Sequence, residues 1–216
     1  MSVDSQAVIS AVSGLDLSGN EEGLIPAFGL YLTRHYANYY NRVSYAYLHA
    51  AEAEGAEPTT RARTSLVKAG EVCGFNTFGG IMLSQEWDAV VQPMIECRED
   101  WVHGITAVIN CLGWGVWSVE SIDPRRLHMK VRDSYESVGY MRDHAKRSDG
   151  ICFLATGGVS SIMNLLYNGD ITRRPALTPA YFETVFGAPH RFAAREVACR
   201  AAGAPCCEFI AEHVHP

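Results

Sequence analysis

The chain has 216 residues, of which 48% are hydrophobic and 19% charged, so it is not a disordered protein and can form one large or two small domains. Its formal net charge of −6 argues against a nucleic-acid-binding surface, because phosphate contacts need clustered Lys and Arg. No stretch approaches the roughly 20 apolar residues of a membrane helix, and the N-terminus lacks a signal-peptide pattern. We therefore expect a cytoplasmic protein that contacts neither membrane nor nucleic acid directly.

The first half of the chain is predicted to be helical. Residues 1–20 are polar and predict a flexible arm, and residues 21–60 predict a Tyr-rich helical segment that ends in a turn at 54–60. The tyrosines surround more than one face, which is typical of a helix that is buried in a core or shared with a second copy in a homodimer. Two further helices are predicted over residues 61–78 and 84–103.

The second half mixes strands with helices. Alternating β-branched residues and a DPRR turn predict a hairpin within residues 105–137. An apolar segment with a glycine turn at Gly157 and Gly158 follows, and then a Pro- and Gly-punctuated excursion over residues 168–190. A last strand is predicted at the C-terminal end. The order of these elements predicts an α+β fold, with N-terminal helices followed by an antiparallel sheet with packed helices over residues 61–216.

The cysteines are the residues that most strongly indicate a functional or structural site. Their odd number, seven, fits free thiols or metal ligands better than a disulfide framework. Three of them lie with one glutamate within the dozen residues 196–207, which is compatible with a buried structural turn, a redox pair or a metal site. The vicinal Cys206 and Cys207 are poorly suited to a disulfide, since vicinal pairs rarely close without strain.

A metal site needs ligands that converge in space. Glu196 and Cys199 precede Gly203, and Cys207 follows it. A chain reversal at Gly203 can bring Cys207 back beside Cys199. Thiolates and a carboxylate in a tetrahedron suit a borderline-soft ion such as zinc. The fourth ligand must come from elsewhere in the chain, and Cys152 is the best candidate because it begins an apolar segment before the glycine pair.

Three segments resemble a known family. They are DSYES at 133–137, ICFLATGGVSS at 151–161 and EVACRAAGAPCCEF at 196–209, and they are similar to the domain named after 4-vinyl reductases, also called hydrocarbon-binding. The same module is the sensor domain of bacterial activators that respond to phenol, toluene and xylene. The resemblance is absent from residues 1–55. It implies a fold similar to the ligand-binding fold of NO signalling and Golgi transport proteins.

The resemblance also implies a structural zinc ion. Matched position by position to the aromatic-sensing branch, its ligands are Cys152, Glu196, Cys199 and Cys207 in a C-terminal subregion over 150–210. Two departures from the family pattern stand out. The linker over residues 168–190 is longer, and Val131 occupies the place of a ring-stacking tryptophan.

A ligand pocket is the second implication. His103 lies at about the position of the family's ligand-binding histidine, Tyr135 belongs to the DSYES segment, and Trp114 and Trp117 fall in a predicted strand region where aromatic rings either line a cavity or fill a core. No catalytic residues are predicted, because no nucleophile elbow, HExxH or Rossmann motif is present.

These observations lead to two hypotheses about function. The first is a homodimeric sensor that binds a hydrophobic or aromatic small molecule, contains a structural zinc ion and passes its signal to a separate signalling or enzyme partner. The alternative is a reductase, or an accessory subunit of one, that acts on a tetrapyrrole or another apolar metabolite. A scaffold of the vesicle-tethering type is a third interpretation. An enzymatic activity is therefore left open, with binding favoured.

Overall fold

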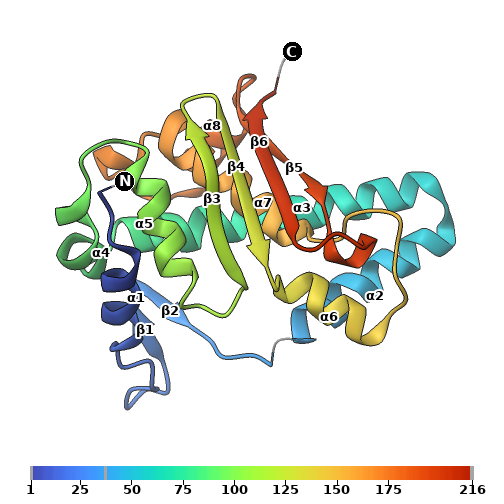
Figure 1. The fold of residues 1–216 in the computed structure, drawn as a ribbon, viewed down its shortest axis with the longest axis horizontal. Helices are drawn as coiled ribbons and strands as arrows, with labels where there is room; N and C mark the ends of the chain where they lie inside the picture. The colour runs from blue at the N-terminus through green and yellow to red at the C-terminus, as the bar shows by residue number, and fades with distance from the viewer. Residues whose placement is uncertain (1, 37, 215–216) are drawn as a thin grey trace.

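A four-stranded antiparallel sheet organises the fold (Figure 1). The computed structural model describes residues 2–36 and 38–214. The sheet has the order β3–β4–β6–β5, so the two C-terminal strands pair with the central hairpin. Its strands are β3 (Val116–Asp123), β4 (Arg126–Arg132), β5 (Phe192–Ala198) and β6 (Cys207–His213). The predicted α+β class, with helices first and an antiparallel sheet after them, is confirmed.

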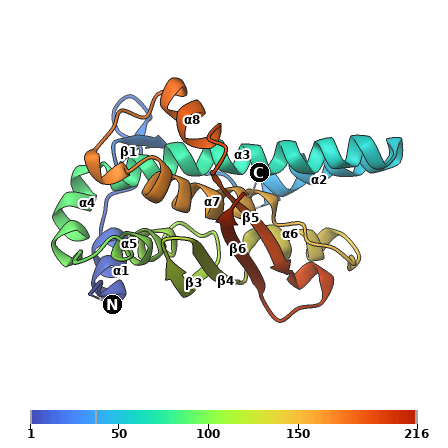
Figure 2. The same cartoon turned by 90° about the horizontal axis from the view of Figure 1, so that it is seen from above.

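Two helices are layered on one face of this sheet (Figure 2). Helix α7 (Phe153–Met163) packs against β4, β5 and β6, and the long helix α3 (Ala56–Met82) packs on α7. The core lies between the sheet and α7, where alternate residues of the strands are buried, among them Leu127, Met129 and Phe209. This is the alternation expected of an antiparallel sheet with one covered face.

The contact between α3 and α7 corrects the prediction of a glycine turn. Gly157 and Gly158 lie inside α7. A Cβ atom on Gly157 would lie 2.2 Å from the carbonyl oxygen of Val67, and one on Gly70 would lie 2.5 Å from that of Leu154. The glycines therefore allow two helix backbones to approach closely. The sequence alone did not distinguish this use of glycine from a turn.

The N-terminal region differs most from the prediction. Residues 1–20 are not a flexible arm throughout, because α1 (Ser5–Ser13) is capped by the Asp4 side chain and buries Val8 and Val12 against α5. The polar composition of the segment concealed this pair of valines at helical spacing.

The predicted helical segment over residues 21–60 is also wrong in its first half. A two-stranded hairpin, β1 (Ile25–Ala27) and β2 (Leu30–Leu32), precedes helix α2 (Asn38–Glu54). The helix α3 then begins at Ala56 after a single glycine, so the predicted boundary at residue 60 falls inside a continuous helix.

The predicted helix over residues 84–103 is two α-helices, and a turn of 3-10 helix over Gln92–Met94, which contains Pro93, lies between them. The short helix α4 (Gln85–Val90) precedes it and α5 (Asp100–Ile109) follows, taking residues that the sequence assigned to a strand. The remaining helices are α6 (Tyr135–Asp143) and α8 (Pro179–Phe186). Helix α8 lies in the 168–190 excursion, where its Phe182 packs against Phe75 of α3.

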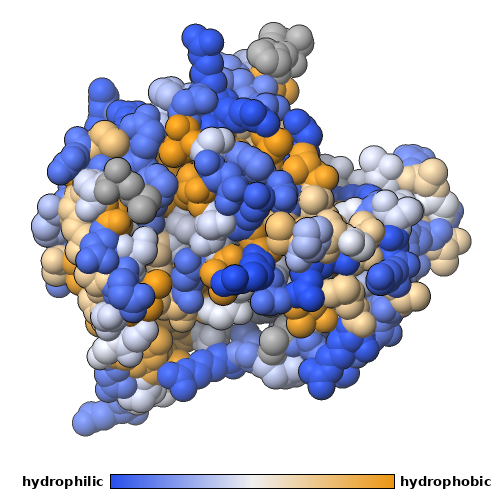
Figure 3. Space-filling model, in the orientation of Figure 1, coloured by the Kyte–Doolittle hydropathy of each residue, from blue (hydrophilic) through white to orange (hydrophobic). Residues whose placement is uncertain are grey.

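The other face of the sheet is polar. Its outward residues include Glu208 of β6, which forms a hydrogen bond with His128 and an ion pair with Lys130, both on β4. Figure 3 shows this side of the molecule as mixed, with hydrophilic residues interspersed by hydrophobic ones. Within the described ranges, no helix combines the length and the apolar character needed to cross a membrane.

Candidate metal centre

The C-terminal hairpin brings two of the predicted ligands together. After β5, a single turn of 3-10 helix over Arg200–Ala202 ends at Gly203, which has a φ of 99°. This left-handed conformation favours glycine, and it turns the chain back into β6. The thiol of Cys207, at the start of β6, then lies close enough to accept a hydrogen bond from the backbone N–H of Arg200 at 3.5 Å. Gly203 therefore reverses the chain as the sequence predicted.

A β-bulge places Glu196 and Cys199 on the same side of the hairpin. In a regular strand, residues three apart face opposite sides, because side chains alternate with a period of two. The pairing with β6 shifts between Glu196 and Ala198, so Val197 is the extra residue of a bulge. A bulge re-aims the side chains that follow it. The Glu-x-x-Cys spacing therefore produces two convergent ligands only because the strand is irregular.

The start of β5 is fixed by helix α7 and by the π-helical turn Asn164–Asn168 that continues it. The side-chain amide of Asn164 donates to the carbonyl oxygen of Phe192 at 2.8 Å and accepts from its N–H at 2.9 Å. The hydroxyl of Ser160 accepts from the N–H of Ala194 at 2.8 Å. These contacts hold the strand in register four residues before Glu196.

Cys152 approaches from the opposite side, at the N-terminus of α7. Its backbone N–H donates to Oε2 of Glu196 at 3.0 Å, and its Sγ lies 3.6 Å from Sγ of Cys207. The ligand atoms of Cys152, Glu196, Cys199 and Cys207 all lie within 4.8 Å of one another. The structure therefore brings together the four residues that the sequence assigned to a metal site, across up to 55 positions of the chain.

The donor atoms fit a metal ion. The Oε1 atom of Glu196 is buried and has no hydrogen-bond partner among the described residues. A buried carboxylate oxygen without a partner is unfavourable unless a proton or a cation satisfies it. Gly150 leaves room for this carboxylate, since a Cβ atom there would lie 2.2 Å from Oε2 of Glu196. Three thiols and one carboxylate are a suitable set for a borderline-soft ion.

The electrostatics of the group favour exchange of protons for a cation. Burial raises the pKa of the Cys152 thiol well above its usual value. Hydrogen bonds from Cys152 and Cys199, supported by the N–H of Arg200, lower the pKa of Cys207. Burial, together with the neighbouring Cys199 sulfur, raises the pKa of Glu196 to about 8. A bound cation would oppose the raised pKa values of Cys152 and Glu196, because metal ligands bind in their deprotonated forms.

The loop before Cys152 is tied to the helices around it. The guanidinium of Arg147 donates to Glu52 on α2 and, at 2.7 Å, to Asp149. These hydrogen bonds lower the pKa of Glu52. The N–H of Arg147 donates to the carbonyl oxygen of Ala201 at 2.9 Å, which joins the loop to the turn between β5 and β6.

Glu136 is a residue that the sequence analysis missed. Its carboxylate, on α6, is buried and accepts from the N–H groups of Leu154 at 3.0 Å and Ala155 at 2.9 Å, at the N-terminus of α7. The sequence showed only an acid near a helix start, and nothing local indicated a distant helix as its partner. Burial raises the pKa of Glu136 to about 8 although two N–H donors favour the charged form. Glu136 therefore orients the helix that carries Cys152.

Cys206 lies outside the group. Its thiol donates to Oε1 of Glu208 at 3.7 Å on the polar face of the sheet. Consecutive residues of an extended chain point to opposite faces, so Cys206 points away from the buried Cys207.

The four residues predicted to line a ligand pocket are spread over several elements. His103 is half-buried on α5, and burial lowers its pKa. Trp114 lies before β3 with its ring 5.7 Å from that of Phe78. Trp117 is buried on β3, where it stacks on Phe209 at 6.3 Å.

The last of the four, Tyr135, begins α6, and its carbonyl oxygen accepts from the Asn41 side chain at 2.9 Å. Both views place α5 and α6 on opposite sides of the β3–β4 hairpin (Figures 1 and 2). None of the four residues lines the cavity among α1, α3, α4 and α5 or the cavity at the β1–β2 hairpin. Their role in a pocket stays a prediction.

Comparison with known proteins identifies the fold. No family model matches the sequence, and no curated protein matches it. The crystal structure of the phenol-responsive sensory domain of the transcription activator PoxR with phenol is similar, with a TM-score of 0.65 over 99% of this chain and 92% of that chain. The sequence identity is 12%, so the similarity shows the fold alone. Membership of the 4-vinyl reductase family stays a prediction.

Proposed function

We propose that this protein is a sensory domain that binds a hydrophobic or aromatic small molecule and contains one structural zinc ion. The observation that supports this most strongly is the fold, which follows that of a phenol-responsive sensory domain over nearly the whole chain. The convergence of three thiols and a carboxylate, predicted from the sequence, supports the zinc ion.

The proposed zinc ion is held by Cys152, Glu196, Cys199 and Cys207. Sulfurs at about 2.3 Å from a tetrahedral ion lie about 3.8 Å apart, and the Cys152 and Cys207 sulfurs are 3.6 Å apart. Four protein ligands leave no position for a substrate, which is typical of structural and not catalytic sites. When bound, zinc supplies a fixed point that fastens the β5–β6 hairpin to the N-terminus of α7.

Further parts of the proposal concern the pocket and the partners. His103, Trp114, Trp117 and Tyr135 remain candidates for contact with the ligand. The exposed tyrosines Tyr39, Tyr40 and Tyr47 on α2 are the proposed surface for a homodimer in the cytoplasm. Aromatic side chains are enriched in the buried centres of such interfaces, which favours this surface.

Native mass spectrometry and thermal unfolding test the proposed function. We expect at least one member of a panel of phenol, toluene, xylene and naphthalene to raise the unfolding temperature, because a ligand that binds only the folded state stabilises it. A panel without effect on the unfolding temperature would contradict the sensory function. A tetrapyrrole that co-purifies with the protein would instead favour the reductase alternative.

A further inference from the structure

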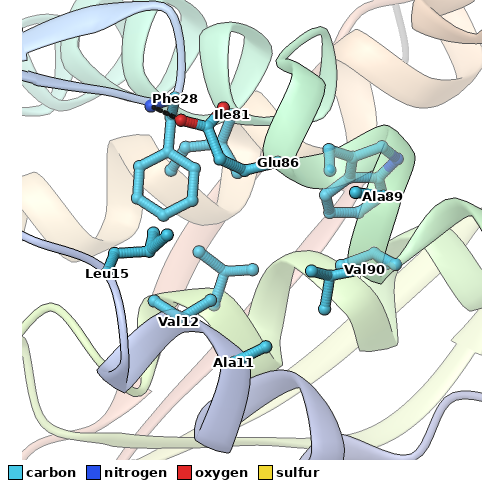
Figure 4. Close-up of a pocket in the computed structure, with 11 residues that line it drawn as sticks. Ala11, Val12, Leu15, Phe28, Ile81, Glu86, Ala89 and Val90 are labelled. Carbon is cyan, nitrogen blue, oxygen red and sulfur yellow. Dashed lines mark hydrogen bonds between the residues drawn. The ribbon is translucent and has the colours of Figure 1, made fainter.

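An apolar cavity lies far from the metal centre, among the N-terminal elements. Its volume is about 180 Å³, and its walls come from α1, the tip of the β1–β2 hairpin, the end of α3, α4 and α5 (Figure 4). Val12 and Leu15 form one side, and Ala89 and Val90 face them from α4. The cavity is partly open to solvent, and its walls belong to segments whose arrangement the sequence did not predict.

The walls of the cavity are almost wholly apolar. Glu86 is the one ionisable residue among them, and its Oε1 atom accepts from the backbone N–H of Phe28 at 3.1 Å. An enclosed cavity of about 150 Å³ lined by aliphatic and aromatic side chains binds benzene, and this partly open cavity is of similar size. The size and the chemistry of this cavity therefore suit one uncharged ring without hydrogen-bonding groups.

The hairpin tip carries backbone strain beside the cavity. Phe28 has a φ of 55° and is followed by Gly29 with a φ of 65°, so both central residues of the two-residue turn are left-handed. Such turns strongly prefer Asn or Asp followed by Gly, and a bulky residue in this conformation is unusual. Phe28 is nevertheless 2% exposed, with its ring directed toward Leu15 and Val12 (Figure 4).

The strain has a specific support. The carboxylate of Glu86 accepts the N–H of Phe28 and so fastens the hairpin tip to the first turn of α4. Strained residues persist where the surroundings determine their conformation, and they cluster at ligand clamps and switch regions. Phe28 is therefore placed to respond to whatever occupies the space beneath its ring.

We propose that this cavity binds one uncharged monocyclic hydrocarbon and that Phe28 closes it. The inference rests on the proposed sensory function and assigns it a location that differs from the four predicted pocket residues. A ligand there contacts α1, the hairpin, α4 and α5 at once. Its binding therefore stabilises the packing of the N-terminal elements on α5 and leaves the metal centre unchanged.

Calorimetric titration with toluene and with phenol, on the zinc-loaded full chain, tests the site. Ala11 lines the cavity at an exposed position of α1, and Ala7 lies one turn earlier, also exposed but outside the cavity. We expect Ala11→Phe to weaken toluene binding at least about tenfold by occupying the space, and Ala7→Phe to leave it unchanged. We expect phenol to bind the wild type about tenfold more weakly than toluene, because the polar atoms of Glu86 contribute almost nothing to the walls and the phenol hydroxyl would lose its hydrogen bonds to water.

The possible results of this titration distinguish failure of the cavity proposal from failure of the proposed sensory function. Toluene binding that resists Ala11→Phe but is lost in His103→Ala would overturn the cavity and retain the sensory function. Binding of phenol without binding of toluene would do the same. If no compound of the panel binds the wild type, both proposals fail.

A second variant tests the closure by Phe28. Replacing the ring in Phe28→Ala enlarges the cavity, so we expect this variant to bind naphthalene, which the wild type excludes. The far-ultraviolet circular dichroism spectrum and toluene binding by the same variant control for its fold. A folded variant that still excludes naphthalene would show that Phe28 does not limit the cavity.

Discussion

The metal centre and the N-terminal cavity are built from opposite kinds of contact. At the metal centre, side chains from α7, β5 and β6 bring buried polar atoms into one place, and Glu196 leaves one of them without a protein partner. At the cavity, α1 and the hairpin rest on α4 and α5 through apolar surfaces. Buried polar groups act strongly and directionally, whereas apolar contacts are weak individually and tolerate gaps.

This difference predicts which changes destabilise each region. In the proposed function the metal centre depends on a bound cation, because a cation would satisfy the buried thiols and the carboxylate that lacks a protein partner. The N-terminal region depends on surface area and on a few anchors, such as the Asp4 side chain that accepts from Gln6 and Ala7 at the start of α1. The following predictions separate the two regions, in order of decreasing effect.

Removal of the metal has the largest expected effect. A strong chelator should destabilise the protein by about 4 kcal/mol or more, which lowers the unfolding temperature by about 10 °C for a chain of this size. Differential scanning calorimetry with and without chelator measures the shift. If the chelator leaves the transition unchanged, the four ligands do not hold an ion that matters for stability.

The substitution Glu136→Gln is expected to cost about 3 kcal/mol. The amide retains one acceptor oxygen, but its NH₂ group faces a backbone N–H of Leu154 or Ala155 where the carboxylate accepted two bonds. Urea unfolding of the zinc-loaded protein at about pH 9, above the raised pKa of Glu136, measures the change. Glu183→Gln at an exposed position of α8 serves as the matched control and should shift the free energy of unfolding by less than about 0.5 kcal/mol. Equal stability of the two variants would remove Glu136 from its role in positioning α7.

Asp100 provides the corresponding test in the N-terminal region. Its buried carboxylate accepts from Ser2 and, at 3.0 and 3.1 Å, from the N–H groups of Glu96 and Cys97. Burial opposes the charge, but these hydrogen bonds outweigh it and lower the pKa of Asp100. We expect Asp100→Asn to cost about 2 kcal/mol at pH 7.

The sign of the pH dependence follows from the lowered pKa. The contribution of Asp100 is complete above the unfolded-state pKa of about 4 and is lost as the pH falls through the lower folded-state pKa, because the unfolded chain takes up the proton first. The difference in unfolding free energy between the wild type and Asp100→Asn should therefore shrink below about pH 4. Urea titrations from pH 3 to 7 measure it. A difference that stays constant or grows on acidification contradicts the assigned hydrogen bonds.

The sequence was most informative about sites whose chemistry depends on the type of residue present. Three cysteines and a glutamate with a reversal at Gly203 predicted a group of side chains that converges in the structure, since few other residue types suit a soft ion. The bulge at Val197, which makes the ligands converge, depends on pairing with β6 and has no local signature. Glu136 was missed for the same reason, because its partners lie on another helix.

The elements that the sequence analysis did not predict are held by apolar contacts, which have no distinctive residue pattern. The pair Val8 and Val12 was too short a pattern to predict α1, and Phe28 is not a residue that marks a hairpin turn. Each wall of the cavity consists of residues that resemble an ordinary core. Gly157 was interpreted as a turn because glycine serves close helix packing and chain reversal equally.

The zinc content per chain, measured by inductively coupled plasma mass spectrometry, tests the metal centre most directly. Cys206→Ser is the matched control for Cys199→Ser, because Cys206 lies beside the group but points to the other face of the sheet. We predict about one zinc ion per chain for the wild type and Cys206→Ser, and a clear loss for Cys199→Ser. Zinc-free wild-type protein after expression with zinc, or equal zinc in both variants, would contradict the site.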